Sequence, residues 1–255
     1  MSGGAGSNSP PLLPKAVLLD MDDTILYDSG NVAQCWQEAC FAHRSEMGAL
    51  EPGALYDVVE RTREWFWSDP ERHRKGRLDL DAARREIVRI SLAGIGMDSP
   101  ALAEKIADRY GSQRELGVQP FGDAIETVRW LRDSGCHLAL LTNGSADSQR
   151  SKVERFKLAE MFDLILIEGE LGYGKPDPRV YRLALDRFGV APTEVWMVGD
   201  NLDWDVGAPQ QLGIFGIWVD VRGEGLPPGH AVRPNRIIRG LWELRARPTL
   251  PSTPG

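Results

Sequence analysis

Cysteine is scarce in this chain, with only Cys35, Cys40 and Cys136 among 255 residues. The three show no C-x-x-C spacing, and their odd number leaves at least one thiol unpaired within the chain. This usage excludes a disulfide framework and a structural zinc site built from cysteines. Because free thiols are typical of a reducing compartment, we expect a cytoplasmic protein.

A basic excess and long apolar runs are also missing. Lys and Arg number 30 against 37 Asp and Glu, a net charge of −7, so the chain offers no footprint for a nucleic acid or an anionic membrane. No stretch approaches the roughly 20 apolar residues of a membrane-spanning helix. A small anionic substrate stays open, because a metal ion or a lysine can reverse the field in one cleft. The histidines show no metal-ligand spacing; they are His43, His73, His137 and His230.

The two ends of the chain differ from the rest in composition. Residues 1–14 and 248–255 are rich in Pro, Ser, Thr and Gly, and the first segment lacks the basic start and apolar run of a signal peptide. We expect both to be disordered tails. The hydrophobic content of 42% and charged content of 26% predict that the remainder is globular.

Short apolar runs alternate with amphipathic segments through most of the remaining chain. The expected strands are 16–20, 137–141, 163–167, 195–198 and 214–219, and the expected helices are 123–135, 145–156, 177–189 and a segment leading to 210–213. Each apolar run ends at a polar or Gly-rich turn, which is typical of a parallel sheet covered on both faces. The pattern predicts an α/β fold with a doubly wound parallel sheet.

Residues 30–117 break this alternation. They contain no convincing strand but several helical stretches, at 31–47, 55–67, 80–94 and 101–110. We therefore expect a helical cap inserted after the first strand, and a core formed by residues 15–29 and 118–247. Within the cap, residues 63–77 join three aromatic residues to a basic run, and we interpret them as helix core and solvated loop in preference to a substrate grip.

Polar residues follow four of the predicted strands. They are Asp20 to Thr24, Thr142 to Gly144, Lys175, and Asp200 with Asp205. In an open parallel sheet, ligands bind beyond the carboxyl ends of the strands. Carboxylates as close as Asp20, Asp22 and Asp23 raise each other's pKa values unless a cation lies among them. An acidic turn at a strand mouth is the alternative, and the local pattern alone does not decide between the two.

Taken together, these strand ends make chemical sense. Several carboxylates facing one point favour a hard divalent cation such as Mg²⁺. A lysine adds positive charge, while a threonine hydroxyl and the N–H groups of a turn at a helix start can hold phosphate oxygens. The combination predicts phosphoryl transfer.

Four segments carry a family resemblance: DMDDT, LLTNGS, GKPDP and VGDNLDWD. In this order and spacing they resemble the four motifs of the haloacid dehalogenase superfamily of hydrolases, over roughly residues 15 to 245. The resemblance is to the phosphatase type of subfamily IA, with a Rossmann-like core and a helical cap. It implies a Mg²⁺-dependent phosphatase that acts on a small phosphorylated metabolite through an aspartyl-phosphate.

The resemblance also implies a role for each matching residue. Asp20 would be the nucleophile, Asp22 the general acid and base, and Lys175 the residue that neutralises charge and contacts the phosphate. Phosphate binding falls to the Thr142 hydroxyl and the backbone of Asn143, with Gly144 in the same turn.

The implied metal ligands are Asp20, the backbone carbonyl of Asp22, Asp200 and Asp205, the last either direct or in the outer shell. The family's G-D-x-x-x-x-D spacing selects Asp205 over Asp203; a helix N-cap is the alternative for Asp205. Asp23 has no catalytic role in the family and is interpreted as a turn or cap residue.

Other functions remain as alternatives. A haloacid dehalogenase of this fold goes with a bulky, non-acidic residue where this chain has Asp22, and it needs no Mg²⁺. A phosphomutase is disfavoured by the VGD segment, which looks more like that of the phosphatases. A non-catalytic phosphate-binding module would be free to lose Asp20 or Asp22, yet both are present. The pattern leaves open whether the protein is a monomer or a homodimer.

Overall fold

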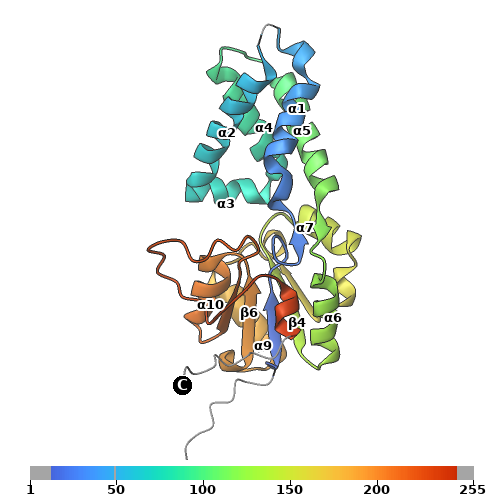
Figure 1. The fold of residues 1–255 in the computed structure, drawn as a ribbon, viewed down its shortest axis with the longest axis vertical. Helices are drawn as coiled ribbons and strands as arrows, with labels where there is room; N and C mark the ends of the chain where they lie inside the picture. Colours follow the sequence, from blue (N-terminus) through green and yellow to red (C-terminus); the bar gives the residue numbers. More distant parts are fainter. Residues whose placement is uncertain (1–12, 49, 246–255) are drawn as a thin grey trace, which may run out of the picture.

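The computed structural model describes residues 13–48 and 50–245, so the predicted tails lie outside the described residues except for Leu13 and Pro14. The chain forms a sheet-containing core and a helical body that stands over one end of that sheet (Figure 1). Among the described residues, no helix is both long and apolar enough to cross a membrane.

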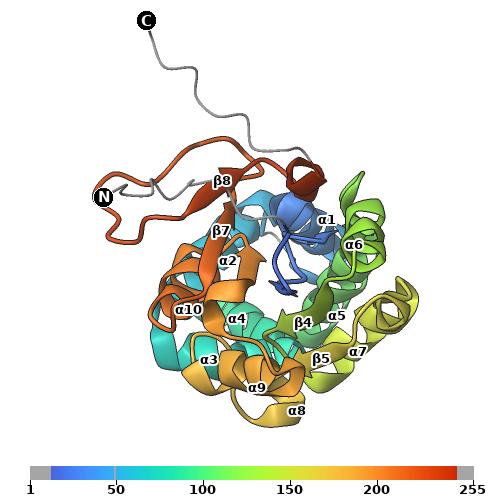
Figure 2. The same cartoon turned by 90° about the horizontal axis from the view of Figure 1, so that it is seen from below.

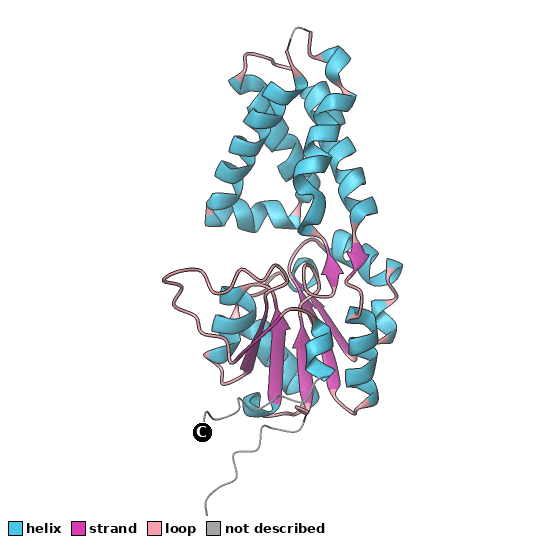
Figure 3. Cartoon of the chain, viewed as in Figure 1, coloured by secondary structure: helices cyan, strands magenta, loops and turns pink. Residues whose placement is uncertain are grey.

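The core contains a six-stranded sheet in which all neighbours are parallel (Figure 3). Its order is β5 (Leu164–Ile167), β4 (His137–Thr142), β1 (Ala16–Leu19), β6 (Val195–Gly199), β7 (Phe215–Val219) and β8 (Arg236–Ile238). The predicted α/β fold with a doubly wound parallel sheet is confirmed. Strand β8 was not predicted, because it has only three residues and begins with an arginine.

Helices cover both faces of this sheet (Figure 2). One face packs on α6 (Ala124–Asp133), α7 (Ala146–Arg155) and the 3-10 helix η6 (Leu241–Arg245), and the other on α9 (Pro178–Phe188) and α10 (Ala208–Gln210). Side chains along β1 alternate between the two layers: Val17 and Leu19 join the first, Ala16 and Leu18 the second. Burial on both faces explains why the strand is uniformly apolar.

The helical body consists of α1 (Val32–Ala42), α2 (Pro52–Ser68), α3 (Pro70–Leu78), α4 (Leu80–Gly94) and α5 (Pro100–Gly117). Its buried side chains form a core separate from those that cover the sheet. In that core, Trp36 of α1 stacks on Tyr110 of α5 with ring centroids 3.7 Å apart. We call residues 30–117 the cap.

Helix α3 replaces the solvated loop that we expected from the basic run. Asp69 accepts a hydrogen bond from the backbone N–H of Arg72, and Pro70 occupies the first turn. Lys75 and Arg77 lie in the last turn, where cations favour a helix end. The expectation was wrong because these end signals outweigh the high charge of the segment. The helix lies at the bottom of the cap, facing the core (Figure 1).

Two short strands join the connections between core and cap. Strand β2 (Leu26–Tyr27) pairs antiparallel with β3 (Gln119–Pro120), in the register Leu26 to Pro120 and Tyr27 to Gln119. The remaining short helices are η1 (Ser29–Asn31), η2 (Arg44–Glu46), η3 (Leu158–Glu160), α8 (Glu168–Leu171), η4 (Pro192–Glu194) and the π-helix η5 (Leu202–Gly207). The pairing of β2 with β3 thus holds the two connections between core and cap side by side.

Candidate active site

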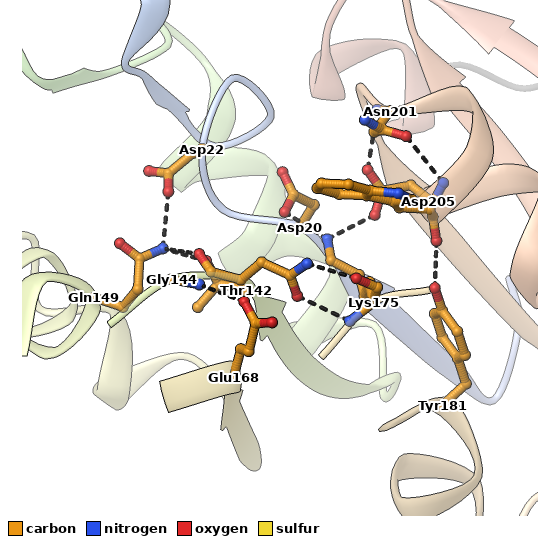
Figure 4. Close-up of polar contacts among 12 residues, drawn as sticks. Asp20, Asp22, Thr142, Gly144, Gln149, Glu168, Lys175, Tyr181, Asn201 and Asp205 are labelled. Carbon is orange, nitrogen blue, oxygen red and sulfur yellow. Dashed lines mark hydrogen bonds and ion pairs between the residues drawn. The ribbon is translucent and has the colours of Figure 1, made fainter. Parts of the chain in front are cut away.

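The carboxyl ends of three adjacent strands meet below the cap. Asp20 follows the central strand β1, Thr142 ends β4 on one side of it, and Asp200 follows β6 on the other. Figure 4 shows the polar contacts at this edge. Neighbouring parallel strands thus bring Asp20 close to residues that lie more than 100 positions later in the sequence.

Lys175 is the central cation of this site. Its side chain is buried, and Nζ donates to Asp20 Oδ1 and to Asp205 Oδ1, each at 2.6 Å. Burial alone lowers the pKa of Lys175, but the two carboxylates more than offset this and raise the pKa above its ordinary value. Lys175 is therefore a fixed ammonium between two aspartates.

Asp205 reaches the site from the π-helix η5. Its Oδ2 accepts the backbone N–H of Asn201 at 3.0 Å, while the Asn201 side chain caps the helix by accepting from Asp203 and Trp204. A Cβ at Gly199 would lie 2.3 Å from the Asp205 carboxyl, so only glycine leaves room for it. Asp203 is exposed, and its Oδ1 lies 3.7 Å from Nε2 of His230. The structure thus brings Asp205, and not Asp203, to Lys175.

Three carboxylates form an acidic cluster beside Lys175. Asp20, Asp200 and Asp205 each offer an oxygen, and these oxygens lie within 4.8 Å of one another. Burial, together with the negative charges of the neighbouring aspartates and against the opposing effect of Lys175, raises the pKa of Asp20 to about 7 and that of Asp200 to about 9. Oδ2 of Asp20 is buried without a hydrogen-bond partner among the described residues. A set of oxygen ligands whose negative charges are under-compensated fits a hard divalent cation.

The turn at the start of α7 is built for close contact. Asn143 braces it against the next loop, because its side chain donates to the Lys175 carbonyl at 2.6 Å and accepts the Lys175 N–H at 2.8 Å. Gly144 has φ of +130°, and a Cβ there would press on Gln149 at 3.3 Å. The Gly144 N–H donates to Glu168 at 3.1 Å. The Asn143 side chain and the Gly144 N–H are thus occupied within the protein.

Asp22 does not join the acidic cluster with its side chain. Its carboxylate lies over α7, where it accepts a hydrogen bond from Gln149 at 2.8 Å (Figure 4) and another from Lys152 at 2.7 Å. Asp23 occupies a tight turn with φ of 58° and accepts the N–H of Asp28 at 3.1 Å. Asp22 therefore contacts helix α7, whereas Asp23 stabilises its own turn.

Three residues of this site were missed from the sequence: Gln149, Lys152 and Glu168. The strand-end rule that selected the other residues also points to Glu168, which directly follows β5. For Gln149 the available signal was its position four residues before the apolar Val153, on the buried face of α7. Lys152 carries no such signal, because an isolated lysine on a helix is usually solvated.

The geometry can be compared with known proteins. The sequence model of the haloacid dehalogenase-like hydrolases matches residues 14–213. The chain belongs to this family. The family resemblance predicted from the four motifs is confirmed, and with it the expectation of an enzyme, a hydrolase.

Phosphatases are among the curated relatives. A phosphoserine phosphatase from Thermus thermophilus is 42% identical over 234 residues, covering 84% of this chain and 90% of the relative. A glyceraldehyde 3-phosphate phosphatase from Methanopyrus kandleri is 31% identical over 204 residues, covering 78% and 81%. Among solved structures, a 2-haloacid dehalogenase from Pseudomonas syringae matches with a TM-score of 0.61 at 27% identity, covering 91% of this chain and 97% of the other. Both chemistries of the family thus occur among its relatives.

Proposed function

We propose that this protein is a Mg²⁺-dependent phosphatase that hydrolyses a small phosphate monoester through an aspartyl-phosphate. The observation that carries this proposal is the setting of Asp20. One of its oxygens is fixed by Lys175, and the other is buried without a hydrogen bond among the described residues. An anionic oxygen held in this way is suited to attack on phosphorus. The two phosphatase relatives support the same conclusion.

Each residue then has a task in two displacements. Asp20 Oδ2 forms a bond to phosphorus, the bond from phosphorus to the ester oxygen breaks, and Asp22 gives that oxygen its proton. Water next attacks the phosphorus, Asp22 takes a proton from the water, and the Asp20–phosphate bond breaks to release inorganic phosphate. Lys175 holds Asp20 in line and offsets negative charge during both steps.

The cation would be held by the carboxylates of Asp20 and Asp200 and by the backbone carbonyl of Asp22. When bound, it supplies positive charge that stabilises the phosphate oxygens in the transition state. For Asp205, whose two oxygens already accept from Lys175 and the Asn201 N–H, we propose the outer shell.

Phosphate binding is assigned to the turn after β4. The Thr142 hydroxyl accepts a hydrogen bond from Gln149, which leaves its own proton to donate to a phosphate oxygen. The backbone of Asn143 would contribute at the start of α7. Since the Gly144 N–H is already donated to Glu168, we assign Gly144 the shape of the turn.

Dehalogenation is the second candidate, because a dehalogenase is among the matching structures. The acidic residue Asp22 disfavours it, since a dehalogenase has no leaving alcohol to protonate. The deciding experiment measures turnover of p-nitrophenyl phosphate with and without Mg²⁺, next to halide release from 2-halo acids. We expect Mg²⁺-dependent phosphate release only; halide release without phosphatase activity would contradict the proposal.

The substrate class follows from the same argument. We propose a small phosphorylated metabolite, with phosphoserine and glyceraldehyde 3-phosphate as the first compounds to assay because relatives act on them. We further propose that residues 15–29 and 118–247 form the catalytic core and residues 30–117 its cap. A cytoplasmic location fits the three free, buried thiols, and we propose a monomer or homodimer that binds neither nucleic acid nor membranes.

A further inference from the structure

The side chain of Asp22 is held from one face of α7. Lys152 Nζ donates to Oδ1 at 2.7 Å, and Gln149 Nε2 donates to Oδ2 at 2.8 Å. Residues three apart share one face of a helix, so the two donors approach the carboxylate together. Both oxygens of Asp22 are therefore fixed by a single rigid element.

Gln149 connects Asp22 to the phosphate-binding turn. Its side chain is buried, and Nε2 also donates to Thr142 Oγ1 and to the carbonyl of Asn143 at 3.0 Å. Nε2 has two hydrogens for these three acceptors, so at least two of the acceptors share one N–H group. Any displacement of Gln149 would move Asp22 and Thr142 with it.

Lys152 connects Asp22 to the entry and exit of the cap. Nζ also donates to Asp28 Oδ2 at 3.3 Å, and Asp28 Oδ1 accepts from Arg114 at 2.9 Å. Asp28 follows β2 in the first connection, whereas Arg114 lies in the last turn of α5 before the second connection. Lys152 thus pairs both with Asp22 in the core loop and with Asp28 in the connection that leads to the cap.

We infer that Lys152 and Gln149 are positioning residues for Asp22, and that Lys152 makes the place of this carboxylate depend on the cap connection through Asp28. The inference rests on the proposed role of Asp22 as the proton donor to the leaving group. A carboxylate on a loop has several rotamers, and two donors on a packed helix select one of them. What the two residues fix is the place of the carboxylate.

Leaving-group dependence separates positioning from general support of the fold. p-Nitrophenolate departs without being protonated, whereas the alkoxide of an alkyl phosphate needs the proton from Asp22. In Lys152→Met, we expect kcat/KM for the best alkyl phosphate to fall about tenfold or more relative to that for p-nitrophenyl phosphate. Asp22→Asn should show the same selective loss. Equal losses on both substrates, or no loss on either, would overturn the inference.

A control on the same helix is available. Arg150→Met removes a cation of α7 that pairs with the exposed Glu170 and makes no hydrogen bond to Asp22 among the described residues, so it should change neither kcat/KM value. Lys152→Gln serves as a second variant if Lys152→Met unfolds, with thermal unfolding recorded for each protein.

A crystal structure of Lys152→Met distinguishes failure of this inference from failure of the proposed function. We expect the Asp22 carboxylate to leave its present place over α7. If it stays in place, the inference is wrong even in an active phosphatase. If the wild-type enzyme hydrolyses no phosphate ester, the proposed function fails, while a displaced carboxylate still shows that Lys152 positions Asp22.

Discussion

Arg77 of the cap and Glu168 of the core form a two-pronged ion pair, with N–O distances of 2.5 and 2.7 Å. The Glu168 side chain is only 5% exposed, and it also accepts the N–H of Gly144. The cap is thus anchored directly to the turn that we assign to phosphate binding. The guanidinium of Arg77 lies 5.3 Å from the ring of Trp204, which follows β6.

Substitutions of Arg77 and Glu168 should have strongly non-additive effects on the free energy of unfolding. Arg77→Met leaves a buried carboxylate without its cation, so we expect a loss of about 3 kcal/mol in the free energy of unfolding. In the double variant with Glu168→Gln, part of this loss should return, because the unpaired charge is gone. Urea unfolding of the four proteins measures the coupling. Strictly additive effects would show that the cap is held elsewhere.

Asp20→Asn should abolish phosphatase turnover, by about 10⁴-fold or more, because the amide keeps the shape but lacks the nucleophilic anion. Thermal unfolding should show a folded protein. Asp23→Asn is the matched control, since it makes the same change in the same loop at a residue with no proposed catalytic or metal-binding role; it should retain activity. Turnover close to that of the wild type in a folded Asp20→Asn protein would exclude the proposed nucleophile.

Chelation by EDTA should remove activity, and Mg²⁺ should restore it. A second readout is thermal: Mg²⁺ should raise the melting temperature of the wild type but not that of Asp200→Ala. Without metal, this variant should be at least as stable as the wild type, because folding no longer buries a carboxyl group whose pKa is raised to about 9 by burial and by the neighbouring aspartates. Asp203→Ala, which removes an exposed carboxylate from the π-helix η5 that follows Asp200, is the control and should keep the response. Full activity in the chelated enzyme would refute the metal site.

Small phosphate esters should be hydrolysed more efficiently than phosphopeptides or 5′-phosphorylated oligonucleotides. The cap stands over the strand ends, with α3 facing the core (Figure 1), and a lid in this place disfavours a folded macromolecule as substrate. The net charge of −7 also repels a polyanion at long range. Values of kcat/KM at matched ionic strength test this. A macromolecular substrate with the higher value would redirect attention to the basic residues of α3.

The sequence predicted the elements whose signals are local and strong. Central strands such as β1 are buried on both faces, and their uniform apolar runs were placed within one residue or two of their ends. The four-motif order also selected the residues at the strand ends, including Asp20 and Lys175, which the structure brings together. Pattern and topology are sufficient here because parallel strands deliver their ends to one edge.

The contacts that depend on tertiary packing were not predictable. Lys152 lies 130 positions from Asp22, and Arg77 lies 91 positions from Glu168. Each is an ordinary charged residue on an amphipathic helix, and only the docking of that helix supplies its partner. The charge of α3 led to a wrong prediction for the same reason, because the ion pair of Arg77 with Glu168 of the core cannot be predicted from a basic run.

The pairing of β2 with β3 has a consequence for how such a protein diversifies. Because Leu26 lies opposite Pro120, the two ends of the insertion emerge side by side, and the order of strands in the sheet does not depend on what lies between them. An insertion of different length or sequence can therefore replace the present one between β2 and β3. Selection can thus change the helices that stand over the strand ends while the order of the strands below them stays the same.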